Sequence, residues 1–418
     1  MSVQLFPEPT EEQRMMADSA IRIMEAEYPM TTVRESAERS EPADEKLWRT
    51  LGSLGCFRLL ASEDHGGGTL SGNGVADAAI IAAERGARLA PGPFVGTHVT
   101  AGTLSRIASS RAQEATALPG GVLEALLSGE AAATWATWGL LGDTRGPGIT
   151  ATETSKGFAL SGVIKAVQDA DECDWILVSA PIAGAVRQFL LDRRAAGLSL
   201  HKSDGLDITR RHFDLTLTDV RADELAGGAE HAKQASLADW QVAVAAVLSA
   251  AESVGAMDAN FALALAYSKT RIAFGRPIGS FQGLKHLLAR TSLALEMAKA
   301  LVAGAAEALG SGAADGPAMG SMARAFVSEN AVELTQDCFQ VFGGIGFTWE
   351  HDQHLFMRRL ASEAYLFGSP AWHRRRVWQL SPGGATPRTP QGAPDGEANV
   401  SGAQSASAGD VAKEAADA

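Results

Sequence analysis

Two segments in the second half of the chain have residue types suited to binding a nucleotide. The first, Tyr267–Gln282, reads YSKTRIAFGRPIGSFQ. It places Arg271 in the expected last turn of an amphipathic helix that ends near Phe274–Gly275, because Pro277 forbids its continuation. A fixed guanidinium can bind a diphosphate through parallel hydrogen bonds, or it can simply complement the helix dipole. The residue types leave both interpretations open.

The second segment, Gln340–Glu350, reads QVFGGIGFTWE. Gly343, Gly344 and Gly346 are expected to expose backbone amides in a turn between two helices, a place suited to a nucleotide. Most glycine-rich turns only redirect the chain, so this turn alone is weak support for a site. The spacing is not GxGxxG and no strand precedes it, which argues against a Rossmann site.

Acid–base and metal chemistry have fewer candidates. Glu252 follows the apolar run Val242–Ala251. Its carboxylate could accept a proton, or it could be a polar-face residue on an otherwise apolar helix. His351 and His354 have a spacing that can share a metal ion, but no third ligand is near in sequence. No metal site is therefore predicted.

Composition limits the class of protein. The 418 residues carry a net charge of -13, and the densest basic run is the short Arg374–Arg376, so a nucleic-acid partner is not expected. The three cysteines, Cys56, Cys173 and Cys338, are far apart, which is typical of a reducing compartment. No segment reads as a signal peptide or is long enough to span a bilayer. A cytoplasmic protein without membrane contact is expected.

The elements that must position these residues fall in the order helical, β, helical. Residues 1–130 are predicted to be an N-terminal helical domain, 131–228 a middle β domain, 229–380 a helical bundle and 381–418 a disordered tail. Apolar periodicity predicts the following helices: Glu11–Glu27, Asp44–Leu54, Gly74–Arg85, Ala238–Ser268, Gln282–Leu309, Pro317–Phe342 and Glu350–Leu366. Alternation predicts these strands: Gly157–Leu160, Trp175–Ala180, Gln188–Leu191 and His212–Leu217.

This order and several motifs resemble the acyl-CoA dehydrogenase family over residues 10–380. The strongest matches are Arg271…Phe274-Gly275…Pro277-Ile278…Phe281-Gln282 and Gln340…Gly343-Gly344. Weaker ones are Leu47-Trp48 to Gly66-Gly67, Glu84-Arg85-Gly86 with Pro91-Gly92-Pro93, and Gly162–Lys165 running to Asp174. The resemblance implies an α+β fold: an N-terminal helical domain, a middle β-barrel or sandwich and a C-terminal four-helix bundle.

The resemblance also implies FAD as cofactor, an acyl-CoA substrate and an electron-transfer acceptor. In the family the two strongest segments reach across to hold the adenine-diphosphate half of a neighbouring subunit's FAD, so an oligomer is implied. The residues carried over to cofactor binding are Arg271, Phe281, Gln282, Gln340, Gly343 and Gly344. Gln168 joins them, because Ala166-Val167-Gln168 stands where the family has Trp-Ile-Thr flavin contacts.

The chain departs from the family where chemistry occurs. Phe367 stands at the usual position of the catalytic glutamate, and the alternative position, in Val242–Leu248, has no ionisable residue. Glu252 is about 10 Å further along the helix and is the nearest substitute. The loop that wraps a subunit's own flavin has become Thr137–Pro147, which lacks the family's Thr-Glu-Pro.

These losses favour one hypothesis over two others. The resemblance is to actinobacterial enzymes built from two unlike subunits, so the chain is predicted to be a non-catalytic subunit in a heterotetramer, completing the FAD site of a paralogous subunit in fatty-acid or steroid side-chain breakdown. The first alternative is a self-sufficient dehydrogenase with an unusual base such as Glu252. The second is a non-redox acyl-binding or scaffold protein on the same fold.

Overall fold

The computed structural model describes residues 2–381 except 40–44, 111–119, 138–140, 142–147, 156, 183–184 and 226–230. Residues 382–418, which cover nearly all of the predicted disordered tail, lie outside the described residues. Most of the loop Thr137–Pro147 also lies outside them.

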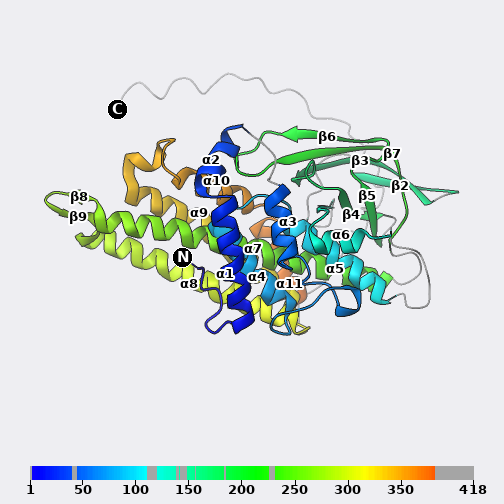
Figure 1. Ribbon diagram of the computed structural model, residues 1–418, viewed down its shortest axis with the longest axis horizontal. Coiled ribbons are helices and arrows are strands. Elements are labelled where there is room, and N and C mark those ends of the chain that lie inside the picture. The colour runs from blue at the N-terminus through cyan, green and yellow to red at the C-terminus, as the bar shows by residue number, and fades with distance from the viewer. Residues whose placement is uncertain are drawn as a thin grey trace, which may run out of the picture. The chain divides into compact units, whose positions relative to one another are not determined.

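The first part of the chain is helical (Figure 1). Thr10 begins the first helix with a capping box, in which its hydroxyl accepts from the Gln13 N–H and the Gln13 side chain accepts from the Thr10 N–H. The helices are α1 (Glu11–Glu27), α2 (Met30–Arg39), α3 (Glu45–Ser53), α4 (Gly74–Ala87), α5 (Phe94–Ser110) and α6 (Val122–Ser128), with a short 3₁₀ helix, η1 (Glu63–His65).

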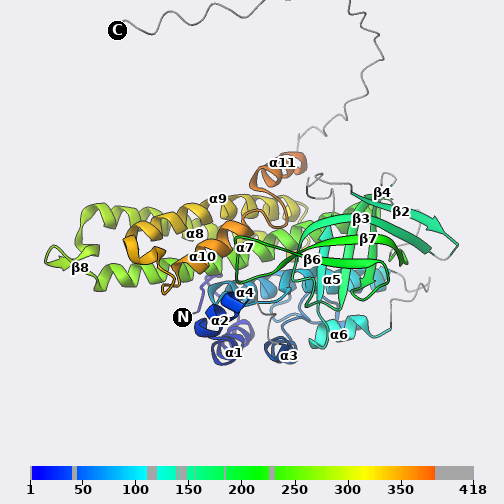
Figure 2. The same ribbon diagram turned by 90° about the horizontal axis from the view of Figure 1, so that it is seen from above.

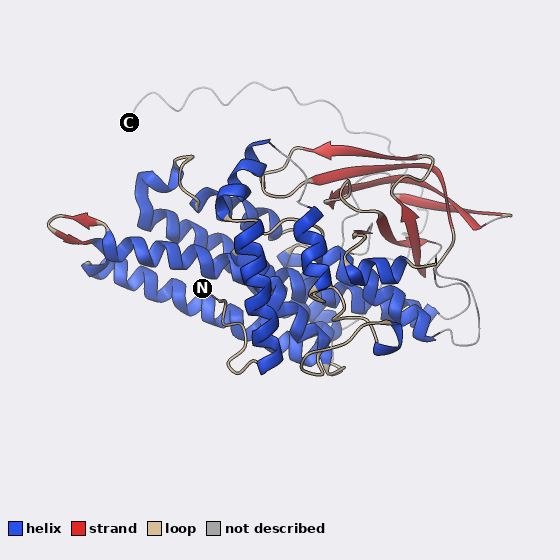
Figure 3. Cartoon of the chain, viewed as in Figure 1, coloured by secondary structure: helices blue, strands red, loops and turns tan. Residues whose placement is uncertain are grey.

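The strands of the middle part of the chain form two sheets, which lie at one end of the helices (Figure 3). The first sheet has the order β1-β4-β5, from Ala133–Thr137, Trp175–Ile182 and Ala185–Asp192, with β1 parallel to β4. The second has the order β2-β3-β7-β6 and is antiparallel, from Ile149–Thr154, Gly157–Gln168, His212–Ala222 and Leu198–Ser203. Leu160, Ile176, Phe189 and Leu215 belong to the core shared by both sheets. The predicted middle β region, given as a barrel or a sandwich, is confirmed as a sheet region between the two helical parts.

The last part of the chain is again helical (Figure 2). Its elements are α7 (His231–Thr270), a hairpin of β8 (Ile272–Ala273) and β9 (Arg276–Pro277), η2 (Ile278–Ser280), α8 (Gln282–Gly310), α9 (Gly316–Phe342), η3 (Gly343–Phe347), α10 (Gln353–Glu363) and α11 (Pro370–Leu380). Helix α7 packs against α4, α8, α9 and α10, and α9 also packs against α8 and α11. The N- and C-terminal helices share one hydrophobic core.

The predicted fold class is confirmed, with differences at element ends. Helix α7 stops at Thr270 rather than near Phe274–Gly275, because the chain turns there into the β8–β9 hairpin. Arg271 therefore lies just beyond the helix and not in its last turn. Helix α10 begins at Gln353 and not at Glu350, since the 3₁₀ turn η3 and a further turn come first. The domain boundaries stay a prediction.

Helix α7 is the central helix of the core. The expectation that no segment is long enough to span a bilayer is wrong: Ser236–Thr270 is apolar and long enough, but 89% of its most apolar window is buried inside the protein. Glycines let α4 approach it closely. A Cβ at Gly86 would lie 1.8 Å from the Glu252 carbonyl oxygen, and one at Gly255 would lie 1.8 Å from the Ala83 carbonyl oxygen. This close approach brings Arg85 and Glu252 together.

A neutral histidine is locked in the N-terminal core. The ring nitrogens of His98, on α5, lie 3.0 Å from the Phe94 carbonyl oxygen and 3.1 Å from that of Cys56. Burial lowers the pKa of His98 to about 4, although both carbonyls favour the protonated ring. The ring is therefore neutral near pH 7.

Acidification should destabilise the protein through His98. Between pH 6.5 and about 4 the unfolded chain binds a proton that the folded chain does not, so stability rises with pH over this window, by up to about 3 kcal/mol. Thermal denaturation across this range should show a shallower pH slope for His98→Gln than for the wild type. The exposed control His201→Gln should keep the wild-type slope; an equal slope in His98→Gln would contradict the assignment.

Candidate functional site

The first predicted nucleotide-binding segment lies at the end of the bundle that carries the β8–β9 hairpin (Figure 1). The Arg271 N–H donates to the Tyr267 carbonyl at 2.8 Å, and its carbonyl accepts from the Ile278 N–H at 2.9 Å, so the backbone is fixed. Its side chain is exposed, and within the described residues its guanidinium has no hydrogen-bond or ion-pair partner. Arg271 is thus a rigidly mounted cation that is free to bind an anion.

Phe281 and Gln282 follow the hairpin at the start of α8. Gln282 is exposed and Phe281 is partly exposed. The Arg276 guanidinium lies 4.1 Å from the centroid of the Phe281 ring, and Phe274, which is 95% exposed, makes an edge contact with the same ring. The hairpin therefore presents aromatic and cationic groups together.

The glycine turn follows α9 at the same end of the bundle. The Tyr267 and Phe342 rings are 5.1 Å apart and join the end of α7 to the end of α9. Gly343 has a φ of 62° and donates its N–H to the Phe339 carbonyl, so the expectation that this amide is free is wrong. Gly344 is exposed, and a Cβ there would meet no atom within 4 Å. A ligand can approach this backbone closely.

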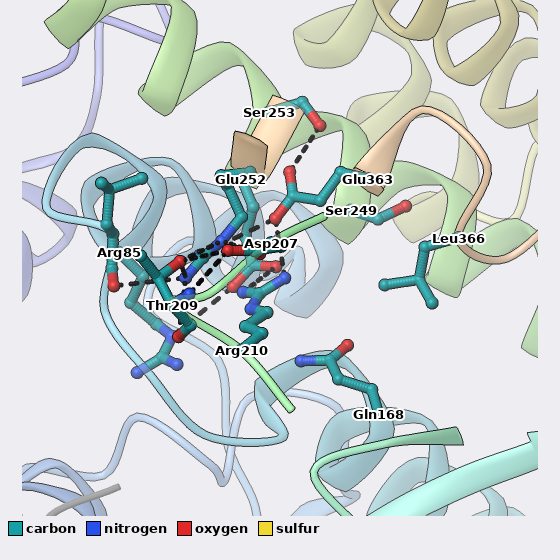
Figure 4. Close-up of polar contacts among 12 residues, drawn as sticks. Arg85, Gln168, Asp207, Thr209, Arg210, Ser249, Glu252, Ser253, Glu363 and Leu366 are labelled. Carbon is teal, nitrogen blue, oxygen red and sulfur yellow. Dashed lines mark hydrogen bonds and ion pairs between the residues drawn. The ribbon is translucent and has the colours of Figure 1, made fainter. Parts of the chain in front are cut away.

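Gln340 is exposed in the last turn of α9, whereas Gln168 is only 4% exposed. The Gln168 side-chain amide donates to the Asp169 carboxylate at 2.9 Å. The structure therefore brings Arg271, Phe281, Gln282, Gln340 and the glycine turn to one end of the bundle and places Gln168 elsewhere, at the end of β3. Figure 4 shows Gln168 without a contact to the other residues drawn there.

Phe367, at the usual base position, is partly buried in the turn after α10. Its ring stacks on that of Trp135, from β1, with a centroid distance of 5.9 Å and an interplanar angle of 17°. The chain therefore presents an aromatic pair at this point and no carboxylate.

Glu252 belongs to a buried charge cluster (Figure 4). Arg210, in the segment between β6 and β7, donates to the Glu252 carboxylate at 2.9 Å and to the Glu363 carboxylate at 2.7 Å. Ser253 donates to the other Glu363 oxygen at 2.8 Å. Arg210 thus joins the sheet region to α7 and α10.

Three further arginines surround this bridge. Arg359 donates to the Asp207 carboxylate at 2.8 Å and to the Thr209 hydroxyl at 2.6 Å. Arg324, from α9, donates to the carbonyl oxygens of Glu363 and Leu366 and so holds the turn after α10. The Arg85 Nε lies 3.7 Å from the Glu252 carboxylate. The cluster connects α4, α7, α9 and α10 with the segment before β7.

Burial and the mutual charges set the protonation of the cluster. Burial raises the pKa of Glu363 against the opposing effect of Arg210, and it lowers the pKa of Arg85 to about 10. Although burial opposes it, the charge of Arg359 with the Thr209 hydrogen bonds lowers the pKa of Asp207. Glu252 is 1% exposed, so its interpretation as a polar-face residue is wrong. Its carboxylate is buried and paired with Arg210, so it does not face a substrate.

Sequence reasoning did not select Arg210, Arg324 or Glu363. One signal was present: Arg359 and Glu363 are four residues apart on a helix whose neighbouring positions are apolar, and such spacing aligns side chains on one buried face. Nothing in the sequence pairs this helix with Arg210, which lies 153 residues from Glu363. That pairing is a long-range property of the fold.

The two histidines considered for a metal have other contacts. His354 lies 3.2 Å from the Trp349 carbonyl oxygen and stacks on the Trp349 ring, while His351 Nδ1 accepts from the Gln353 N–H. Within the described part of the chain, no three His, Cys, Asp or Glu side chains converge as metal ligands.

The chain is similar to known proteins in both sequence and structure. Residues 10–122 match the acyl-CoA dehydrogenase N-terminal domain, and residues 235–379 match the acyl-CoA dehydrogenase C-terminal domain. The chain is 30% identical to the acyl-CoA dehydrogenase IpdE2 of Mycobacterium tuberculosis over 376 residues, 89% of this chain and 99% of the relative. Among solved structures, the Tcur3481-Tcur3483 steroid ACAD variant has a TM-score of 0.76 at 26% identity, covering 88% of this chain and 97% of its own.

The ChsE4-ChsE5 complex from Mycobacterium tuberculosis shares the fold, with a TM-score of 0.76 at 22% identity over 88% of this chain and 97% of its own. The chain belongs to the acyl-CoA dehydrogenase family, oxidoreductases that act on CH–CH bonds. This confirms the predicted family and its cofactor, FAD.

The residues fit FAD unequally. The guanidinium of Arg271, which has no partner in the described part of the chain, and the open backbone at Gly344 suit the charged, nucleotide half of a cofactor bound by another subunit. The residues at the other end do not suit an isoalloxazine bound by this chain itself, because Trp135 and Phe367 pack on each other and Gln168 turns toward Asp169. One half of a flavin site fits and the other does not.

Removing Arg210 should destabilise the protein strongly. Arg210→Met leaves Glu252 and Glu363 buried without their bridging cation, which should lower the free energy of unfolding by about 3–5 kcal/mol. Urea and thermal denaturation measure this, with the exposed Arg194→Met as a control that should change stability by less than about 0.5 kcal/mol. A mild effect like that of the control would show that the cluster does not join these elements.

Proposed function

We propose that this chain is the non-catalytic subunit of a hetero-oligomeric acyl-CoA dehydrogenase and completes the FAD site of a paralogous partner. The observation that carries the proposal is the contrast between the two half-sites. Arg271, Gln340 and Gly344 are exposed and available to a nucleotide, whereas the base position is Phe367 packed on Trp135. A subunit built in this way can hold a neighbour's cofactor but cannot remove a proton.

The similarity to assemblies with two chain names supports the partner role. The relatives include a steroid ACAD named for Tcur3481 and Tcur3483 and a complex of ChsE4 with ChsE5. We propose by analogy a heterotetramer acting in the cytoplasm on an acyl-CoA thioester, in fatty-acid or steroid side-chain breakdown, with an electron-transfer acceptor reoxidising the flavin.

In the proposed reaction the two chains have different roles. The partner's carboxylate must take the α-proton, while bound FAD supplies a hydride acceptor for the β-carbon. In this chain, Arg271 would bind the diphosphate, Gln340 would donate or accept at the nucleotide, and the Phe281 ring would pack on it. These contacts hold the cofactor in place without taking part in proton transfer.

The alternative of a self-sufficient enzyme using Glu252 finds no support in the geometry. Glu252 is fully buried and bridged by Arg210, with Arg85 on its other side. A carboxylate that accepts the α-proton must become neutral, which would leave these cations without their partner.

Expression with and without a partner tests the proposal. The lone chain should purify colourless and inactive, and co-expression with a paralogous chain that carries the family glutamate should give a yellow complex that bleaches anaerobically with its acyl-CoA. A lone chain that is yellow and oxidises a thioester would contradict the partner role. A chain that binds no flavin with any paralogue would favour a non-redox function.

Arg271 gives a residue-level test on the assembled complex. Arg271→Ala removes charge-assisted hydrogen bonds to the diphosphate and should weaken FAD binding about 10- to 100-fold. Lys269→Ala is a matched control, because Lys269 is an exposed cation at the same end of α7. Flavin retention measured after gel filtration should fall only for Arg271→Ala; equal retention in both variants would remove Arg271 from the site.

The Glu252→Gln variant tests whether Glu252 has a structural or a catalytic role. Gln keeps the shape of the side chain but removes its charge, so the melting temperature of the complex should fall while turnover per bound FAD stays within about twofold of wild type. A loss of turnover of about 100-fold or more per FAD would instead identify Glu252 as the base.

A further inference from the structure

Trp349, two residues after η3, is held at its ring, its indole N–H and its carbonyl. The ring stacks on that of His354, with a centroid distance of 4.8 Å and an interplanar angle of 21°. The indole N–H donates to the Glu38 carboxylate of α2 at 2.7 Å. The Trp349 carbonyl accepts from Arg34, also of α2, and lies 3.2 Å from His354 Nε2. Because Trp349 is 45% exposed, these contacts are not needed to bury it. They fix the chain at this point.

Arg34 and Glu38 are four residues apart on α2, a spacing that places two side chains on one face of a helix. Besides the Trp349 carbonyl, the Arg34 guanidinium donates to the Glu350 carbonyl at 3.2 Å and to the Asp352 carboxylate. A guanidinium with several acceptors holds them in a fixed arrangement. Helix α2 thus fastens the segment that joins η3 to α10, 315 residues further along the chain (Figure 1).

The glycine turn lies between this fastened segment and the end of α9. Its first residue, Gly343, donates its N–H to the Phe339 carbonyl of α9. The Phe347 ring at its other end stacks on that of Phe339, with a centroid distance of 4.4 Å. Between these contacts Gly344 and Ile345 are exposed. The turn is therefore held at both ends, and its exposed middle keeps one shape.

Order in this turn matters for any ligand that contacts its backbone. Glycine loses more conformational freedom on ordering than any other residue, so a loose glycine turn is costly to fix. A ligand that must order its own site binds more weakly, because the ordering cost reduces its binding free energy. The contacts from α2 order the far end of the turn before a ligand arrives.

We infer that Arg34 and Glu38 are positioning residues for FAD, which fix the far end of the glycine turn and so prepare its exposed backbone for the nucleotide half of the cofactor. This rests on the proposed function, and it assigns part of the shared flavin site to the N-terminal helical region. Both residues act through Trp349 and the turn, and not by contact with the cofactor.

Arg34→Met tests the inference, because it removes the donors to the Trp349 and Glu350 carbonyls while keeping an unbranched side chain. In the lone chain, amide hydrogen exchange measured by mass spectrometry should become faster in residues 343–350 and stay unchanged in α8. In the assembled complex, FAD release on dilution, followed by flavin fluorescence, should be about tenfold faster than in wild type. Faster exchange in the turn with an unchanged rate of FAD release would overturn the inference.

Glu38 offers a matched set of variants. Glu38→Leu removes the acceptor for the Trp349 indole, whereas Glu38→Gln keeps an amide oxygen that can accept. Glu35→Leu is the control, because Glu35 is exposed on the same helix and has no hydrogen-bond or ion-pair partner among the described residues. FAD release should be about threefold faster for Glu38→Leu and close to wild type for the other two variants.

This set decides the matter if Arg34→Met does not assemble, because the Glu38 contact is exposed and is not needed for folding. A purely structural role would lower the melting temperature of Glu38→Leu without changing FAD release, and that result would contradict the inference. Arg271→Ala identifies which proposal has failed. If only Arg271→Ala weakens FAD retention, the shared site stands and the role of α2 is wrong; if Arg271→Ala has no effect either, the proposed function itself fails.

Discussion

The bridge from Arg210 to Glu252 and Glu363 is the interaction on which the arrangement of this chain depends. It joins the segment before β7 to α7 and α10, and so fixes the sheets against the bundle. Through Ser253 and Arg324 it also sets the turn that carries Phe367. A buried bridge of this kind contributes little net stability compared with apolar packing. An arrangement that separates its members is destabilised, because it leaves a buried charge without its partner. Its consequence is a defined geometry where the two regions meet.

The hairpin end and the sheet end of the bundle carry different groups. At the hairpin end, backbone contacts fix Arg271, and its guanidinium has no partner among the described residues, which suits the nucleotide binding that we propose for it. At the sheet end, the same rigidity holds two aromatic rings where a carboxylate would be needed. The chain keeps the family fold and the exposed cation at the hairpin end, but it has Phe367 at the position of the catalytic carboxylate. This contrast is what the proposed partner role accounts for.

The sequence predicted the parts of this account that depend on local pattern. Apolar periodicity places α1 and α8, because burial of one helical face is a local signal. Motif spacing places Arg271 and the glycine turn, although it does not show that the Gly343 N–H is used to cap α9. Glu252 was misread, because its burial comes from α4 and Arg210, distant in sequence. The Trp135–Phe367 stack pairs residues from opposite halves of the chain, and no local pattern indicates it.

The central claim is that one flavin site is shared by two unlike chains. The most direct measurement is the ratio of FAD to polypeptide in the assembled complex, from flavin absorbance after denaturation and quantitative analysis of each chain. The account predicts one FAD for each pair of unlike chains, with none retained by this chain when the partner is removed. Two FAD molecules for each pair, or one FAD on each isolated copy of this chain, would contradict it.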